Sequence, residues 1–181
     1  MMKTFANTIS FLFHPLLMAT YGILIVLSAS YLSLFPIKVK LIIAACTFVS
    51  TALVPAVFIF FLIRNGAATD IELSNRKERA LPYLIIITSF IICIFYLQRM
   101  NMPFWIISVV SGATVALLIA LCINFFWKIS AHALGIGGLL GAVMGVSRIH
   151  LVNPWLAFIA LFLVVGLVCT SRIYLNRHTP L

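Results

Sequence analysis

Long apolar runs alternate with short polar segments along this chain. A helix needs about 20 mostly apolar residues to cross the hydrocarbon core of a membrane, because every backbone polar group must be paired within it. Six runs approach or exceed this length, and they cover residues 11–35, 41–63, 80–97, 102–127, 130–146 and 151–170. The pattern therefore predicts an all-α fold, a polytopic transmembrane helical bundle of about six spans.

The first run is interrupted at one point. His14 stands beside Pro15 within residues 11–35. A proline inside a helix removes a backbone hydrogen bond and bends the helix. We expect a kink here, with His14 in a local hydrogen bond rather than in a catalytic role.

The fifth run is short for a membrane span and rich in glycine. Gly137, Gly141 and Gly145 recur every four residues within residues 130–146, so they share one face of a helix. Small residues at this spacing let neighbouring membrane helices approach closely. We expect this helix in the middle of the bundle, with close helix contacts along its glycine face.

The composition excludes several classes of protein. Hydrophobic residues make up 64% of the 181 residues, against roughly 45–50% in an ordinary soluble domain. With 12 basic and 3 acidic residues, the chain has too few charges to cover a water-soluble surface. A soluble enzyme, a disordered chain and a secreted disulfide scaffold are excluded. We expect a single transmembrane domain over residues 1–181, with an N-terminal hairpin at 1–63 and a core at 64–181.

The net charge of +9 is spread along the chain rather than gathered on one face. This distribution favours contacts with lipid headgroups and anions, and it argues against nucleic acid as a partner. Six alternating spans place residues 64–79, 128–132 and 171–181 on the side of the N-terminus, with eight of the bases. A positive-inside count makes that side cytoplasmic, but bases that bind an anion distort such a count, so the orientation stays open. Trp105 and His150 end spans on the opposite side and are expected at the membrane interface.

The three segments on the N-terminal side offer the chemistry of an anion site. Arginine holds tetrahedral oxyanions through forked hydrogen bonds. Ser130 stands where the N-cap of the fifth helix is expected, so the free N–H groups of that helix would face an anion. The chain therefore predicts a phosphate site at one face of the membrane.

These segments are similar to the tripartite signature of the type 2 phosphatidic acid phosphatase superfamily, membrane lipid-phosphate phosphatases related to vanadium haloperoxidases. The signature reads K-x-x-x-x-x-x-R-P, then P-S-G-H, then S-R-x-x-x-x-x-H-x-x-x-D. The third element appears as Ser171-Arg172 with His178 at the family spacing, and the second as Ile129-Ser130-Ala131-His132. The first appears as Arg76-Lys77-Glu78-Arg79-Ala80-Leu81-Pro82, with the bases and the proline but a different spacing. The resemblance covers about residues 64–181.

The resemblance implies a metal-independent phosphatase that acts on a lipid phosphomonoester or pyrophosphate in two steps. His178 would attack phosphorus and form a phosphohistidine, and His132 would protonate the leaving oxygen. The implied phosphate-binding residues are Arg172, Arg79, Arg76, Lys77 and Ser130. No metal and no cofactor is implied. The expected partners are a lipid phosphate and the surrounding lipids, and the expected location is the inner membrane of a bacterium, crossed several times.

The family pattern continues beyond the matched histidine. Its last element ends in an Asp four residues after the nucleophilic His, and a further helix follows. Position 182 would hold that Asp, so we expect that the chain lacks the last span of the family. Without that span, His178 would lack its orienting partner and the site would lack one wall, which would impair activity. The alternative is a non-catalytic membrane protein of the same fold, which binds phospholipid headgroups or acts as a scaffold.

Overall fold

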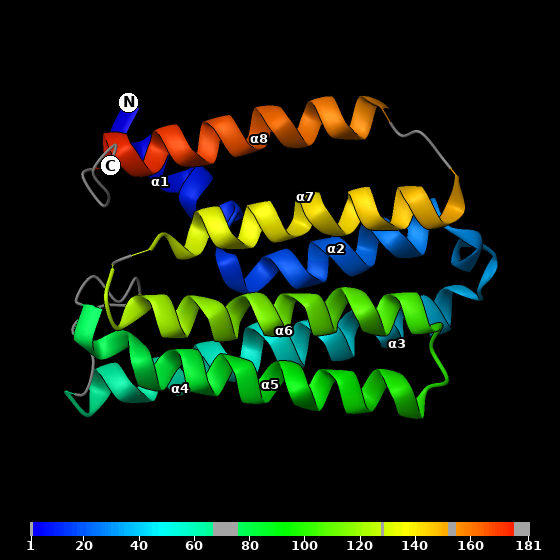
Figure 1. Ribbon diagram of the computed structural model, residues 1–181, viewed down its shortest axis with the longest axis horizontal. Coiled ribbons are helices and arrows are strands. Elements are labelled where there is room, and N and C mark those ends of the chain that lie inside the picture. Colours follow the sequence, from blue (N-terminus) through cyan, green and yellow to red (C-terminus); the bar gives the residue numbers. More distant parts are fainter. Residues whose placement is uncertain (1, 67–75, 128, 152–154, 176–181) are drawn as a thin grey trace.

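The computed structural model describes residues 2–66, 76–127, 129–151 and 155–175, without the side chains of residues 76 and 77. These residues form a bundle of long, roughly parallel helices and include no strand, so the predicted all-α bundle is confirmed (Figure 1). The α-helices are α1 (Met2–Leu12), α2 (Pro15–Ala29), α3 (Ile37–Phe48), α4 (Val54–Arg64), α5 (Ala80–Arg99), α6 (Phe104–Asn124), α7 (Ala131–His150) and α8 (Trp155–Tyr174). Three shorter helical turns are η1 (Tyr31–Leu34), the π-helical η2 (Val49–Leu53) and η3 (Arg76–Arg79).

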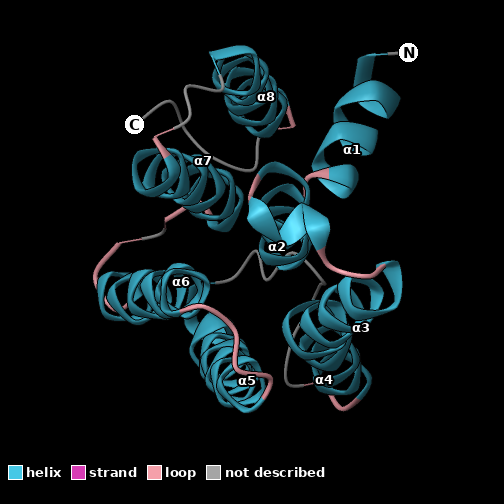
Figure 2. Ribbon diagram, turned by 90° about the vertical axis from the view of Figure 1, so that its right-hand side faces the viewer, coloured by secondary structure: helices cyan, strands magenta, loops and turns pink. Residues whose placement is uncertain are grey.

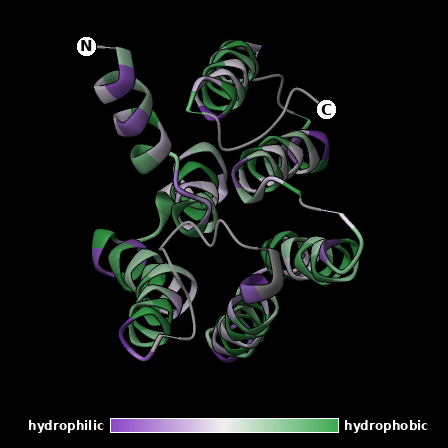
Figure 3. Ribbon diagram, turned by 90° about the vertical axis from the view of Figure 1, so that its left-hand side faces the viewer, coloured by the Kyte–Doolittle hydropathy of each residue, from purple (hydrophilic) through white to green (hydrophobic). Residues whose placement is uncertain are grey.

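The helices have the length and surface of membrane spans. Within the described residues, five helical segments are long and apolar enough to cross a membrane, and the bent pair α1–α2 brings the number to six. A span of 20 residues, such as α5, covers about 30 Å, the thickness of the hydrocarbon core. Large apolar side chains such as Phe58, Phe95 and Phe162 are exposed on the outside, where lipid replaces water. Hydrophobic residues predominate along most of the helices (Figure 3). The chain is a multi-pass integral membrane protein.

The first span is broken where the sequence predicts a kink. Helices α1 and α2 meet at an angle of 59°. His14 is extended, with φ −64° and ψ 137°, because the residue before a proline avoids the helical conformation. Its Nδ1 accepts the N–H of Leu16 at 3.4 Å and caps α2. The predicted kink and local hydrogen bond of His14 are confirmed, whereas a continuous span over residues 11–35 is not what the chain forms.

Helix α2 lies at the centre of the bundle, with the other helices around it (Figure 2). Its buried Ile23, Val26 and Leu27 belong to the largest hydrophobic cluster, together with Leu97 of α5 and Ile106 of α6. The expectation that the fifth run takes the middle position was wrong. Helix α7 instead packs beside α2, between α6 and α8 (Figure 2).

The glycine face of α7 does not make the close contacts that its spacing predicts. A Cβ added at Gly137, Gly141 or Gly145 would meet nothing within 4 Å, because all three glycines are exposed, and Gly141 and Gly145 also border a cavity. The close contact is at Gly135, where a Cβ would lie 3.0 Å from Met18 Cγ and 3.2 Å from Pro15 Cα of α2. Helix α7 also continues past position 146 to His150.

The contact at Gly135 predicts an unequal effect of two matched substitutions. Gly135→Val is expected to destabilise the protein by about 1–3 kcal/mol, since the added methyl groups press on the backbone at Pro15. Gly137→Val makes the same chemical change on the same helix with open space around it. Thermal unfolding in detergent should show a lower midpoint for Gly135→Val only. Equal midpoints for the two variants would contradict the close contact between α2 and α7.

The connections sort into two ends of the bundle. Helices α4, α6 and α8 end, and α1, α5 and α7 begin, at the same end of the bundle (Figure 1). We call this the proximal end; it contains Arg79, Ser130 and Arg172. The opposite, distal end contains Trp105 and His150. The described parts of the three polar segments that the sequence placed on one side thus meet at the proximal end; they cover residues 64–66, 76–79, 129–132 and 171–175.

Candidate functional site

Arg172 is buried inside the proximal end, in the last turn of α8. Its side chain is 5% exposed, and its Nη1 donates a hydrogen bond of 3.0 Å to Ser10 Oγ on α1. Ionisable side chains within membrane spans are rare because their burial is unfavourable, and they mark functional positions. Packing of α1 against α8 holds this arginine in place.

His132 meets the same serine from the other side. It is the second residue of α7 and is also 5% exposed. Its Nε2 lies 3.2 Å from Ser10 Oγ and 3.2 Å from the carbonyl oxygen of Ser10. Because a carbonyl oxygen only accepts, the second contact is a hydrogen bond when Nε2 carries the proton. One oxygen atom, Ser10 Oγ, therefore lies within hydrogen-bond distance of both Arg172 and His132.

Arg79 is the second buried arginine at this end. It closes η3 and stands directly before α5, where its side chain is 5% exposed. Its Nη1 donates a 2.8 Å hydrogen bond to the carbonyl oxygen of Ile129, in the connection between α6 and α7. This acceptor is neutral, as is the Ser10 hydroxyl that Arg172 contacts, and each bond orients a guanidinium group.

Ser130 caps the N-terminus of α7, as the sequence predicts. Its backbone is extended, and its Oγ accepts the N–H of Ala133 at 3.3 Å. The oxygen accepts in this bond, so its O–H hydrogen can be donated to a further group. The free N–H groups and the positive dipole end of α7 lie beside His132.

A second imidazole approaches the cluster from the break between α1 and α2. The rings of His14 and His132 lie 5.5 Å apart between centroids and meet edge to face. The interpretation of the sequence assigned His14 to the kink alone and did not consider Ser10. The available signal was weak, since both are single polar residues near an apolar run. Their partners lie more than 100 residues away along the chain.

The structure brings together four of the predicted site residues: Arg79, Ser130, His132 and Arg172. The backbone of Arg76 and Lys77 forms η3 with Arg79, but their side chains lie outside the described part of the chain, as does His178. Among the described residues, no group of three or more His, Cys, Asp or Glu side chains could hold a metal ion. Arg172 and His132 converge on Ser10 Oγ, and Arg79 bonds the backbone just before α7. Buried donors of this kind at one end of the bundle suit an oxyanion.

Compared with known protein families, curated proteins and solved structures, this chain matches none. The geometry of its own residues therefore carries the assignment of function.

Proposed function

We propose that the protein is an integral membrane phosphatase that hydrolyses a lipid phosphomonoester or pyrophosphate through a phosphohistidine intermediate. The observation that carries this proposal is the position of Ser10 Oγ, an oxygen within hydrogen-bond distance of Arg172 and His132. A phosphate oxygen near this position would meet the same two donors. The three matched motif segments support the proposal, because they meet at one end of the bundle.

The buried cations supply the electrostatic part of the reaction. Phosphoryl transfer involves little covalent chemistry by the protein, so catalysis comes chiefly from positioning and from donors that stabilise charge on the phosphate oxygens. Arg172 and Arg79 provide two guanidinium groups that are already desolvated and oriented. The Ser130 hydroxyl and the first N–H groups of α7 add neutral donors. Arg76 and Lys77 complete the proposed set by resemblance to the family.

Two histidines take part in the covalent steps, His178 as the nucleophile and His132 as the proton donor and acceptor. A ring nitrogen of His178 attacks phosphorus, the bond from phosphorus to the lipid oxygen breaks, and that oxygen takes the Nε2 proton of His132. Water then attacks phosphorus and gives a proton to His132, while the P–N bond breaks, so that phosphate is released and the His178 ring is free again. The role of His178 rests on its spacing from Arg172 in the family pattern. Ser10 and His14 act as positioning residues for His132.

The surroundings of the site indicate the substrate class and the location. A site at the end of a transmembrane bundle reaches groups at the membrane surface, which supports a lipid substrate. By resemblance to the family, the candidates are phosphatidate, phosphatidylglycerophosphate, polyprenyl pyrophosphate and lipid A. In a bacterium, a helical bundle of this kind belongs in the inner membrane, because proteins of the outer membrane are β-barrels.

Phosphate release from these four lipids, measured with purified protein in mixed micelles, tests the proposal. We expect release from at least one lipid, unchanged by a chelator, and an acid-labile, base-stable phosphoryl group on the peptide that contains His178. Protein that binds these lipids without releasing phosphate, and that forms no such phosphopeptide, would instead support a non-catalytic headgroup binder.

A further inference from the structure

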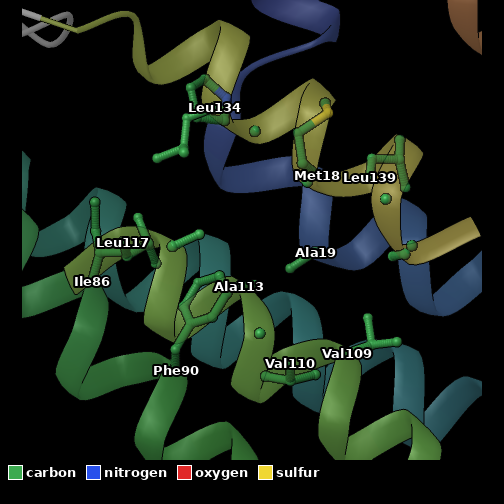
Figure 4. A pocket seen from close by; sticks show the side chains of 18 of the residues that line it. Met18, Ala19, Ile86, Phe90, Val109, Val110, Ala113, Leu117, Leu134 and Leu139 are labelled. Carbon is green, nitrogen blue, oxygen red and sulfur yellow. The ribbon is translucent and has the colours of Figure 1, made fainter. Parts of the chain in front are cut away.

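An elongated cavity adjoins the candidate site. It has a volume of about 520 Å³ and lies between α2, α5, α6 and α7. Figure 4 shows Met18, Leu134 and Leu139 on one side of it, facing Phe90 and Leu117 on the other. Along α7 its lining runs from Ala131 to Ile149, about 27 Å at the helical rise. The cavity therefore extends over most of the thickness of a membrane core.

Almost all of the lining is apolar, and one wall is made of glycine. Gly138, Gly141 and Gly145 of α7 border the cavity, and a Cβ added to any of them would meet nothing within 4 Å. These three glycines therefore leave open space and do not pack against another helix. They lie at increasing distance from the proximal end, with about 10 Å of helical rise between Gly138 and Gly145.

The two ends of the cavity differ in character. Arg79 lines the proximal end, together with Tyr83 one turn further along α5. The Tyr83 side chain is 5% exposed, and its hydroxyl has no hydrogen-bond partner among the described residues. Trp105 lines the distal end, and its ring packs edge-on against His150 at 4.8 Å between centroids. A cation and a buried hydroxyl without a partner thus mark one end, and an aromatic cluster closes the other.

We propose that this cavity holds one hydrocarbon chain of the lipid substrate and that the glycine face of α7 sets the chain length it accepts. The inference rests on the proposed function, since the anionic head would lie at Arg79 and the buried cluster beside it. An apolar slot that ends at a cation complements an amphiphile with a negative head and a single extended tail.

The shape of the cavity favours a single chain. Its lining follows α7 from Ala131 to Ile149, so one extended chain can lie along it, and the second chain of a diacyl lipid would remain in the bilayer. The Tyr83 hydroxyl would donate to the oxygen that joins the chain to phosphate.

Fluorescence of Trp105 measures whether a hydrocarbon chain occupies the cavity, and the measurement needs no hydrolysis of the lipid. The other two tryptophans, Trp127 and Trp155, are replaced by Phe, and single-chain alkyl phosphates of increasing length, each brominated at the tail end, serve as probes. Bromine quenches indole only at contact. We expect quenching of Trp105 to begin at a threshold chain length and to be absent for shorter chains. Quenching that is independent of chain length would overturn the inference.

Leucine substitutions test the depth of the slot. Gly138→Leu is expected to abolish quenching of Trp105 and to lower kcat/KM for long-chain phosphates about tenfold or more. Gly145→Leu should abolish quenching but spare short-chain substrates. Gly137→Leu, which adds the same group to the same helix outside the cavity, should leave both properties unchanged. Gly138→Ala adds only a Cβ, for which there is space. Quenching that persists in this variant shows that its loss in Gly138→Leu comes from a blocked cavity and not from misfolding.

The outcomes separate this inference from the proposed function. Threshold quenching that Gly138→Leu removes, without phosphate release from any lipid, supports the chain slot and refutes the phosphatase. Phosphate release whose rate responds equally to Gly138→Leu and Gly137→Leu supports the phosphatase and overturns the chain slot.

Discussion

Replacement of His132 by Asn is expected to lower phosphate release from a lipid phosphomonoester by about 10²- to 10⁴-fold, the range for loss of a positioned general acid. His132 is buried at the start of α7, and its Nε2 lies 3.2 Å from an oxygen that Arg172 also contacts. In the proposed reaction this nitrogen gives its proton to the leaving oxygen. Asn keeps a polar side chain of similar size but has no proton of suitable acidity to give.

The leaving group distinguishes a general acid from a residue that only supports the fold. A nitrophenyl phosphate, whose leaving oxygen needs no proton, should lose much less activity in His132→Asn than an alkyl phosphate does. His150→Asn is the matched control, because His150 ends the same helix at the distal end. Equal losses with both leaving groups, or a similar loss in His150→Asn, would be incompatible with the role of His132.

Replacement of Arg172 by Lys is expected to lower kcat/KM by about 10²- to 10³-fold, the effect of removing one donor that stabilises transition-state charge. The substitution keeps the charge but loses the planar fork that can hold two oxygens at once. Arg172 is buried and bonded to Ser10 across 162 positions of the chain, so a shorter-reaching ammonium group has no equivalent position. The loss should fall mainly on kcat, since these contacts strengthen as charge develops in the transition state.

Arg99→Lys provides the control for Arg172→Lys. Arg99 ends α5 at the distal end and is exposed, so its exchange should change kcat/KM less than twofold, as expected of surface substitutions. Thermal unfolding of both variants shows whether a loss of activity reflects a loss of folded protein. Full activity of a folded Arg172→Lys protein would remove this arginine from the site.

The membrane spans could be read from local composition alone. Each run over residues 80–97, 102–127 and 151–170 was apolar enough to need lipid around it, and each forms a helix close to those limits. The break at His14 was also local, since a proline restricts the residue before it. The fifth helix was misjudged because the glycine spacing shows which residues share a face but not what that face meets. In the bundle, Gly141 and Gly145 meet a cavity.

The site was only partly accessible from the sequence. The alternation of spans sufficed to place Arg79, Ser130, His132 and Arg172 at one end of the bundle, because an even number of crossings returns the chain to the same side. Ser10 could not be found this way, since its importance arises from two contacts with α7 and α8. Such contacts depend on which helices become neighbours, and local apolar patterns carry no information about that.

The sequence by itself determined that this chain is a membrane bundle with its basic residues near the ends of the spans, because unpaired backbone groups and charges are unfavourable inside lipid and this limits each span separately. Only the tertiary structure decided that α2 occupies the centre, that Ser10 bridges Arg172 and His132, and that a slot lined by glycine extends from Arg79 to Trp105. These features come from packing between distant segments, where the shapes of whole helix faces select the neighbours.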